Sequence, residues 1–277
     1  MKIPDILKKP TSLTVMCMVL SAFTLIAFHF PFFRHVINNI EGGLNGALIT
    51  GGLAIVMLAL NFFIYYILLF AGRIVGKVVL AFSFIGNAVS LYFINSYEVL
   101  ITSQMMGNVF NTQFSEASGF FSIGFILYIL LLGVPPCLYI FLRKFEYGTA
   151  KRFFSNIGIA LGIILGVVAI NIKNTTWIDR NATELGSLLM PWSYTVNSIR
   201  FWNSERKRNA KEILLPDAEI ADSSKKVCVL IIGESARRDR FSLYGYERET
   251  NPLLAGDSVK SYIAESDATY TTAAVKA

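Results

Sequence analysis

The sequence predicts a helical membrane domain followed by a water-soluble α/β segment, and three observations carry this prediction. Of the 277 residues, 54% are hydrophobic and 16% are charged, whereas soluble domains carry roughly 25% charged residues. The charges are unevenly spread, with 15 in residues 1–172 and 29 in residues 173–277. The first part also contains long uninterrupted apolar stretches, so it has the composition of membrane protein.

Five apolar stretches predict five membrane-spanning helices. Each approaches or exceeds the roughly 20 residues that a helix needs to cross the hydrocarbon core. The first follows Lys2, Lys8 and Lys9, but Phe30-Pro31-Phe32-Phe33 comes next instead of a small-residue cleavage site, so we interpret it as an uncleaved span. The stretches cover approximately residues 11–30, 46–70, 74–95, 119–142 and 154–172.

The distribution of lysine and arginine predicts the orientation. These residues cluster at the N-terminus, at Arg73 and Lys77, and across residues 143–152. The opposite loops hold Arg34 and no basic residue in 96–118. Because basic loops remain cytoplasmic, we expect a cytoplasmic N-terminus and residues 173–277 outside, in the periplasm of a bacterium with two membranes.

The charge balance argues against a nucleic-acid-binding protein. The net charge of +6 comes mostly from residues 1–172, which carry 10 basic and 5 acidic residues. The more polar part is nearly neutral, so it offers no basic stripe to a nucleic acid.

An amphipathic segment follows the last apolar stretch. We interpret residues 173–212 as a linker that contains a helix lying at the membrane interface, with Pro191 suited to a first helical turn. A core helix of the outer domain is the alternative. The apolar residues that recur at three- and four-residue steps are Leu185, Leu188, Leu189, Trp192, Val196 and Ile199.

A short apolar run predicts a buried strand. Residues 225–233 read KKVCVLIIG, a pattern typical of a strand buried on both faces of an α/β sheet. Glu234 follows directly, and ligands gather at the carboxyl ends of such strands. Glu234 is therefore a candidate metal ligand, and a capping glutamate or one paired with Arg237 or Arg238 is the alternative.

Residues 233–252, GESARRDRFSLYGYERETNP, closely resemble the signature of bacterial phosphoethanolamine transferases. This family modifies lipid A and includes the mobile colistin-resistance enzymes. Its pattern, Gly-Glu-Ser/Thr-x-Arg and then Gly-Tyr-x-Arg-x-Thr-x-Pro, corresponds here to residues 233–237 and 245–252. The resemblance spans the whole chain and implies five membrane helices, an interfacial connection and a periplasmic alkaline-phosphatase-like α/β domain.

The resemblance also implies the catalytic chemistry. Glu234 matches the family's zinc-binding glutamate, and Thr271 in Thr269-Tyr270-Thr271 matches its nucleophile, which lies at the same zinc ion; Thr269 and Thr272 are the competing positions. In the family, the threonine takes phosphoethanolamine from phosphatidylethanolamine, forms a phosphothreonine, and passes the group to lipid A or a related envelope glycan.

A third motif lies between the third and fourth stretches. The family shows Asn-x-x-x-Thr-x-x-x-Glu-Ala there, which corresponds to Asn108, Thr112, Glu116 and Ala117. Spacings of four and eight predict that the three polar side chains share one face of a helix. The resemblance implies that they hold the lipid head group, with the carboxylate meeting the ammonium group. A solvated loop helix is the alternative.

The chain departs from the family pattern at several points. The family's zinc site needs an Asp-His pair and further histidines, whereas this chain has only His29 and His35, at the outer end of the first stretch. Asp267 and Lys276 replace the cysteines that bracket the nucleophile, and Cys17, Cys137 and Cys228 form no obvious pair. We therefore interpret residues 213–277 as the start of a truncated periplasmic domain and expect little or no activity from this chain alone. Either this relative lacks the cysteine clamp or its reading frame ends early.

Three other functions stay open. One is a phosphoglycerol transferase or sulfatase-like enzyme of the same superfamily, although the Asn108, Thr112 and Glu116 arrangement favours phosphoethanolamine transfer. Another is a five-span membrane scaffold or lipid head-group-binding protein without catalysis. A transporter is less favoured, because the apolar stretches hold almost no ionisable groups to mark a pathway.

Overall fold

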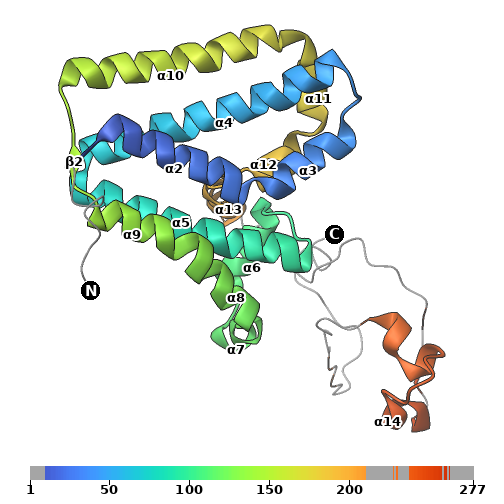
Figure 1. The fold of residues 1–277 in the computed structure, drawn as a ribbon. Coiled ribbons are helices and arrows are strands. Elements are labelled where there is room, and N and C mark those ends of the chain that lie inside the picture. The colour runs from blue at the N-terminus through green and yellow to red at the C-terminus, as the bar shows by residue number, and fades with distance from the viewer. Residues whose placement is uncertain are drawn as a thin grey trace. The chain divides into compact units, whose positions relative to one another are not determined.

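The computed structural model describes residues 10–209, Val227, Val229, residues 237–257, Val259, Lys260 and Tyr262. The chain divides into two compact units, residues 1–213 and 214–277. Figure 1 traces the elements of both units.

Among the described residues, four helical segments of the first unit are long and apolar enough to cross a membrane, and a bent helix pair brings the number to as many as five. These spans agree with the predicted helical membrane domain. The bent pair is α2 (Leu13–Phe28) and α3 (Phe30–Asn39), which meet at 61°. The four spans are α4 (Leu44–Ala71), α5 (Arg73–Tyr97), Ile123–Leu142 and α10 (Ala150–Ile170).

The span Ile123–Leu142 is irregular in its middle. It consists of α8 (Ile123–Tyr128), a π-helical turn η2 (Ile129–Gly133) and α9 (Val134–Leu142). Two prolines occupy the first turn of α9. The N–H groups of a first turn have no partner within their own helix, so proline, which lacks an N–H, is tolerated there. The chain therefore continues as one apolar span across the break.

Helix α4 is central in the first unit. It packs against α2, α5 and α10. The ring of Phe84 on α5 lies 6.0 Å from that of Tyr65 on α4 and 6.3 Å from that of Phe28 on α2. All three side chains are buried, so these aromatic contacts join the helices at the core.

Helix α10 lies alongside α4, away from most of the other spans (Figure 1). Ala160 is its one buried residue among those described. A Cβ added at Gly52 of α4 would lie 2.7 Å from Nδ2 of Asn171 and 3.1 Å from Cγ1 of Val167. The absent side chain at Gly52 lets the two helices approach, as small residues do in membrane helix pairs.

Arg143 and Lys77, two of the basic residues that predicted the orientation, lie at one end of the first unit. There β1 (Thr11–Ser12) pairs in parallel with β2 (Phe145–Glu146). Nε of Arg143 donates a hydrogen bond of 2.7 Å to Oγ1 of Thr11, and Nζ of Lys77 lies 4.3 Å from the ring centre of Phe145. These two positive charges, predicted to face the same side of the membrane, are thus found at the same end of the bundle.

The amphipathic segment forms several helices instead of one. After the turn η3 (Ile172–Asn174), the chain forms α11 (Thr175–Arg180), α12 (Ala182–Leu188) and α13 (Trp192–Asn209). The periodic apolar residues are therefore divided between α12 and α13.

Helix α13 turns both polar and aromatic residues toward the bundle. Ser193 and Asn197 are buried, whereas Val196, Ile199 and Trp202 are 38%, 57% and 58% exposed. The interfacial helix and a core helix of the outer domain both stay predictions, because these exposures describe the first unit by itself.

The described part of the second unit contains η4 (Arg238–Arg240), η5 (Ser242–Tyr244) and α14 (Pro252–Gly256). No strand occurs among these described residues. The predicted strand at 225–233 lies almost wholly outside the described residues, so the α/β domain stays a prediction.

Candidate functional site

Helix α6 (Ser103–Asn111) carries Asn108 and ends just before Thr112. The backbone N–H of Thr112 and its hydroxyl both donate to the carbonyl of Asn108, at 2.8 Å and 2.6 Å. Thr112 itself is extended, with φ −68° and ψ 130°. The helix therefore stops, and a separate short helix α7 (Phe114–Ala117) follows.

The predicted single helical face for Asn108, Thr112 and Glu116 is therefore wrong. Asn108 is exposed and Thr112 half-buried, while Glu116 belongs to α7, and its side chain lies outside what the structure describes. The physical reason is the extended backbone at Thr112, which ends α6 and lets the chain leave the helical path before Glu116. The role of the three residues in head-group binding stays a prediction.

Helix α6 packs closely on α13. A Cβ added at Gly107 would lie 2.7 Å from Cε2 of Phe201, so the glycine gives the ring its place. The Phe201 ring also stacks on Phe110, with ring centres 5.7 Å apart. Asn197 of α13 donates a hydrogen bond of 2.6 Å to the carbonyl of Ile101. The helix that carries Asn108 is thus fastened to α13 by apolar and polar contacts.

The beginning of α13 is in turn bonded to the membrane helices. Nε1 of Trp192 donates to Oδ1 of Asn61 on α4 at 3.2 Å. The hydroxyl of Tyr194 lies 3.0 Å from both Oδ1 of Asn87 and the carbonyl of Ser83 on α5. The sequence interpretation missed these partners, although an asparagine within an apolar stretch signals a polar contact between membrane helices.

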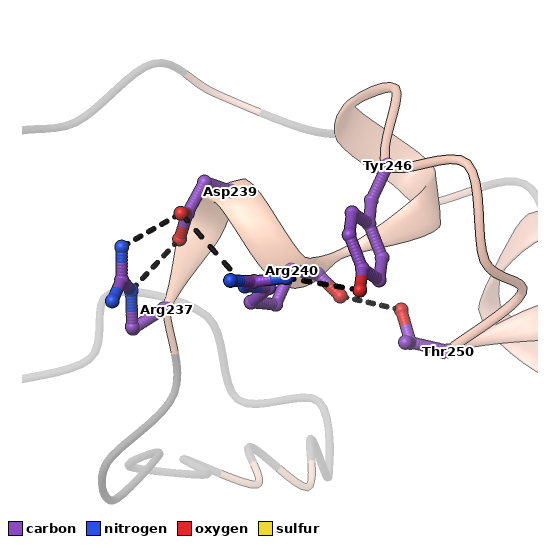
Figure 2. A network of polar contacts seen from close by, with 5 residues as sticks. All are labelled: Arg237, Asp239, Arg240, Tyr246 and Thr250. Atoms are coloured by element: carbon purple, nitrogen blue, oxygen red, sulfur yellow. Dashed lines mark hydrogen bonds and ion pairs between the residues drawn. The ribbon is translucent and has the colours of Figure 1, made fainter.

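The family motif in the second unit forms a network of polar contacts (Figure 2). Arg237 donates two hydrogen bonds to the carboxylate of Asp239, at 3.0 Å and 2.7 Å. The guanidinium group of Arg237 holds the pKa of Asp239 below its usual value. Arg240 donates to the hydroxyl of Tyr246 at 3.0 Å, and Thr250 Oγ1 donates to the carbonyl of Arg240 at 2.7 Å.

The rest of the motif closes the same loop. Oγ of Ser242 donates to Oδ1 of Asn251 at 2.5 Å, and the N–H of Leu243 donates to that oxygen at 3.2 Å. Gly245 has φ +96°, a left-handed conformation that favours glycine. Within the described residues, the contacts of Gly245, Thr250 and Asn251 thus give these motif positions a structural role in folding the loop.

The predicted metal ligand Glu234 and the predicted nucleophile Thr271 lie outside the described residues, together with Thr269 and Thr272. Among the residues that the structure does describe, no group of three or more metal-ligating side chains occurs. Zinc is therefore supported here by family resemblance alone.

The two histidines lie on the bent helix pair or at its junction. His29 is fully buried, with Nδ1 2.9 Å from the carbonyl of Thr24. His35 lies on α3, where Nδ1 is 3.4 Å from Nδ2 of Asn39. Cys17 and Cys137 are free thiols, and Cys228 lies outside the described residues.

Comparison with known proteins identifies the class. A family profile described as phosphoethanolamine transferase EptA/EptB matches residues 56–206, more than half of the chain. The phosphoethanolamine transferase EptA of Helicobacter pylori is 31% identical over 273 residues, which cover 97% of this chain and 51% of that protein. The phosphatidylethanolamine transferase Mcr-1 of Escherichia coli is 28% identical over 201 residues, which cover 68% of this chain and 37% of that protein.

A solved structure shares the fold. The integral membrane protein lipooligosaccharide phosphoethanolamine transferase A from Neisseria meningitidis matches with a TM-score of 0.73 at 21% identity. The match covers 90% of this chain and 48% of that one. Helices long enough to span a membrane and this shared fold define a multi-pass integral membrane protein.

The chain belongs to the phosphoethanolamine transferase EptA family, and the profile match falls on the membrane domain of that family. It spans about half the length, or less, of the curated relatives reported above.

Proposed function

We propose that this chain provides the membrane domain of a phosphoethanolamine transferase in a bacterial inner membrane. The donor is phosphatidylethanolamine, and the acceptor is lipid A or a related envelope glycan. The N-terminus lies in the cytoplasm and the C-terminal segment in the periplasm. The names of the relatives support phosphoethanolamine transfer, and the basic residues at one end of the bundle support the orientation.

The observation that carries the proposal is the attachment of α6 to α13. Gly107 and Phe201 make the close contact, and Asn197 bonds to the carbonyl of Ile101. These contacts fix α6, and with it a head group bound at Asn108, to α13. In the chain, α13 precedes the family motif.

The segment from Asn108 to Glu116 offers groups that suit a head group carrying both charges. The exposed amide of Asn108 has two N–H donors for a phosphate oxygen. The hydroxyl proton of Thr112 is already used on the carbonyl of Asn108, so its oxygen accepts from an ammonium group. Glu116 adds a carboxylate for the same ammonium group, and residues 96–118 contain no lysine or arginine to repel it.

Thr271 is the proposed nucleophile. Its hydroxyl oxygen bonds to the phosphorus of the donor, the bond to the diacylglycerol oxygen breaks, and that oxygen takes up the proton. The phosphothreonine then passes phosphoethanolamine to the acceptor. Glu234 and Thr271 would hold the zinc ion that the family resemblance implies, and the ion would lower the pKa of the threonine hydroxyl.

Mass spectrometry of lipid A tests the proposal in a strain without its own lipid A transferases. One arm expresses the 277-residue chain, and the other continues this chain with the unmatched remainder of the H. pylori relative. We expect no addition in the first arm. The family's zinc site needs histidines, and the two histidines of this chain, His29 and His35, lie at the bent helix pair instead. We expect phosphoethanolamine on lipid A in the second.

Variants of the continued chain assign the roles. Asn108→Ala and Thr271→Ala are expected to abolish the addition, whereas Gln104→Ala, an exposed position one turn earlier on α6, keeps it. An addition that survives Thr271→Ala contradicts the nucleophile, and one that survives Asn108→Ala contradicts the donor site. Absence of addition while the intact relative is active contradicts the proposed function.

A further inference from the structure

A polar pocket of about 270 Å³ lies between α3 and the C-terminal end of α5. Its charged residues are Arg34 from α3 and Glu98 from the end of α5. One wall therefore carries a positive charge and the other a negative charge. A pocket of this size approaches the lower end of small-molecule sites. The lining residues are Phe30, Pro31, Arg34, His35, Asn38, Asn39, Ile94, Asn95 and Glu98.

The two charges are not used in the fold. Within the described residues, neither the Arg34 side chain nor the Glu98 side chain has a hydrogen bond or an ion pair. Opposite charges that line one pocket without neutralising each other offer complementary sites to a ligand that carries both signs.

The backbone at Glu98 points to the same conclusion. Glu98 caps α5 in the left-handed conformation, with φ 54°. Glycine or asparagine normally occupies such a position, because a side chain with a Cβ is strained there. The unusual backbone at Glu98 is consistent with a role for its carboxylate at the pocket.

The walls of the pocket are held by contacts outside it. Nε1 of Trp177 donates to the carbonyl of Asn39 at 3.0 Å, which fixes the end of α3 to α11. Nδ2 of Asn95 donates to the hydroxyl of Tyr128 at 3.0 Å, which fixes the end of α5 to α8. The pocket is therefore formed before a ligand arrives.

His35 supplies a further donor. Its Nδ1 lies 3.4 Å from the amide nitrogen of Asn39, which can only donate. Nε2 of the same ring is buried without a partner among the described residues. An oxygen of a ligand phosphate would satisfy Nε2 in the tautomer that carries its proton there.

The rim of the pocket is apolar on the α3 side. Phe30, which lines the pocket, is 69% exposed, and Ile37 on the same helix is 62% exposed. In a membrane protein such a surface lies against acyl chains. The polar pocket with an apolar rim fits an amphiphile better than a small solute.

We propose that this pocket binds the zwitterionic phosphoethanolamine head group of a phospholipid, with the phosphate at Arg34 and His35 and the ammonium group at Glu98. The site goes beyond the proposed transfer function, because it needs neither Thr271 nor the Asn108 site. Free phosphoethanolamine shares this chemistry, and the experiment separates the two sources.

Native mass spectrometry of the full chain in detergent measures the binding of added phosphatidylethanolamine and phosphatidylglycerol. The chain carries Asn108→Ala, so that binding is independent of the proposed donor site. Glu98→Gln is expected to weaken phosphatidylethanolamine binding roughly tenfold and to leave phosphatidylglycerol unchanged. Arg34→Gln is expected to weaken both lipids. Glu41→Gln and Arg180→Gln, exposed charges outside the pocket lining, serve as matched controls and bind as the parent does.

Glu98→Gly separates the charge from the fold, since glycine suits the left-handed backbone. We expect this variant to lose phosphatidylethanolamine binding without a lower unfolding temperature. Free phosphoethanolamine at the same concentration is expected not to displace the lipid. Parent-like binding by both Arg34→Gln and Glu98→Gln overturns the site, and displacement by the free compound overturns the assignment to lipid.

Discussion

The side-chain amide of Asn197 on α13 donates a hydrogen bond of 2.6 Å to the backbone carbonyl of Ile101, just before α6. Both residues are buried, at 6% and 5% exposure. A buried carbonyl that loses its donor is left without a hydrogen bond from protein or water, and this lowers the free energy of unfolding. This bond therefore fixes the start of the proposed donor-binding segment to the helix that leads out of the membrane domain.

Replacement of this amide tests the attachment. Asn197→Leu keeps most of the volume but leaves the Ile101 carbonyl without its donor, so we expect a loss of about 1–3 kcal/mol in unfolding free energy. Thermal unfolding in detergent measures the loss. Asn203→Leu, at an exposed position on the same helix, is the control. Equal unfolding temperatures for the two variants would show that the bond does not hold α6.

The contact between Gly107 and Phe201 predicts a size-dependent effect. Gly107→Ala places a Cβ 2.7 Å from Cε2 of Phe201, and overpacking of this kind costs about 1–3 kcal/mol. Adding Phe201→Leu should recover part of the loss, because the smaller side chain makes room. Gly158→Ala on α10, where the added carbon meets nothing within 4 Å, is the control. A parent-like melting curve for Gly107→Ala would contradict close packing of α6 on α13.

Two adjacent glycines of α4 offer a matched pair for the packing of α10. Gly52→Ala brings the new carbon to 2.7 Å from Asn171 Nδ2, whereas Gly51→Ala meets nothing within 4 Å. We expect the first substitution to lower the unfolding temperature and the second to leave it unchanged or raise it slightly, since alanine favours helix. The reverse order would mean that α10 does not pack on this face of α4.

The two hydrogen bonds of the Thr250 hydroxyl are expected to stabilise the motif loop, residues 240–251. This hydroxyl donates to the carbonyl of Arg240 and accepts from the N–H of Ser242, at 2.7 Å and 3.0 Å. Thr250→Val preserves the shape and removes both bonds, so amide hydrogen exchange across residues 240–251 should accelerate. Thr250→Ser keeps the hydroxyl and should exchange as the parent does. Indistinguishable exchange in the valine variant would assign the loop's closure to other contacts.

The spans could be predicted from the sequence because length and apolar composition suffice to define a membrane helix. The predicted stretch at 46–70, for example, became Leu44–Ala71. The shared helical face of Asn108 and Glu116 could not, since the prediction assumed an uninterrupted helix. One hydrogen bond, from the hydroxyl of Thr112 to the carbonyl of Asn108, marks where that helix ends.

Contacts across long separations in the chain were beyond the sequence analysis. Periodicity located the apolar residues around Trp192, but a spacing pattern does not say that Ser193 and Asn197 turn inward. The sequence marks Arg34 only as a loop charge, because nothing in it brings Arg34 to the same pocket as Glu98. The roles of Asn61 and Asn87 become clear only from the structure, in which they accept hydrogen bonds from Trp192 and Tyr194.

Photolabelling of the full chain in nanodiscs tests donor binding by α6 most directly. Phosphatidylethanolamine with a diazirine at the start of one acyl chain is the label, and peptide mapping locates the adduct. We predict labelling of peptides within residues 103–117. Excess phosphatidylethanolamine should suppress this labelling, and excess phosphatidylglycerol should not. Asn108→Ala should abolish the labelling, and Gln104→Ala should preserve it. Equal suppression by both lipids, or labelling that Asn108→Ala leaves unchanged, would contradict the account.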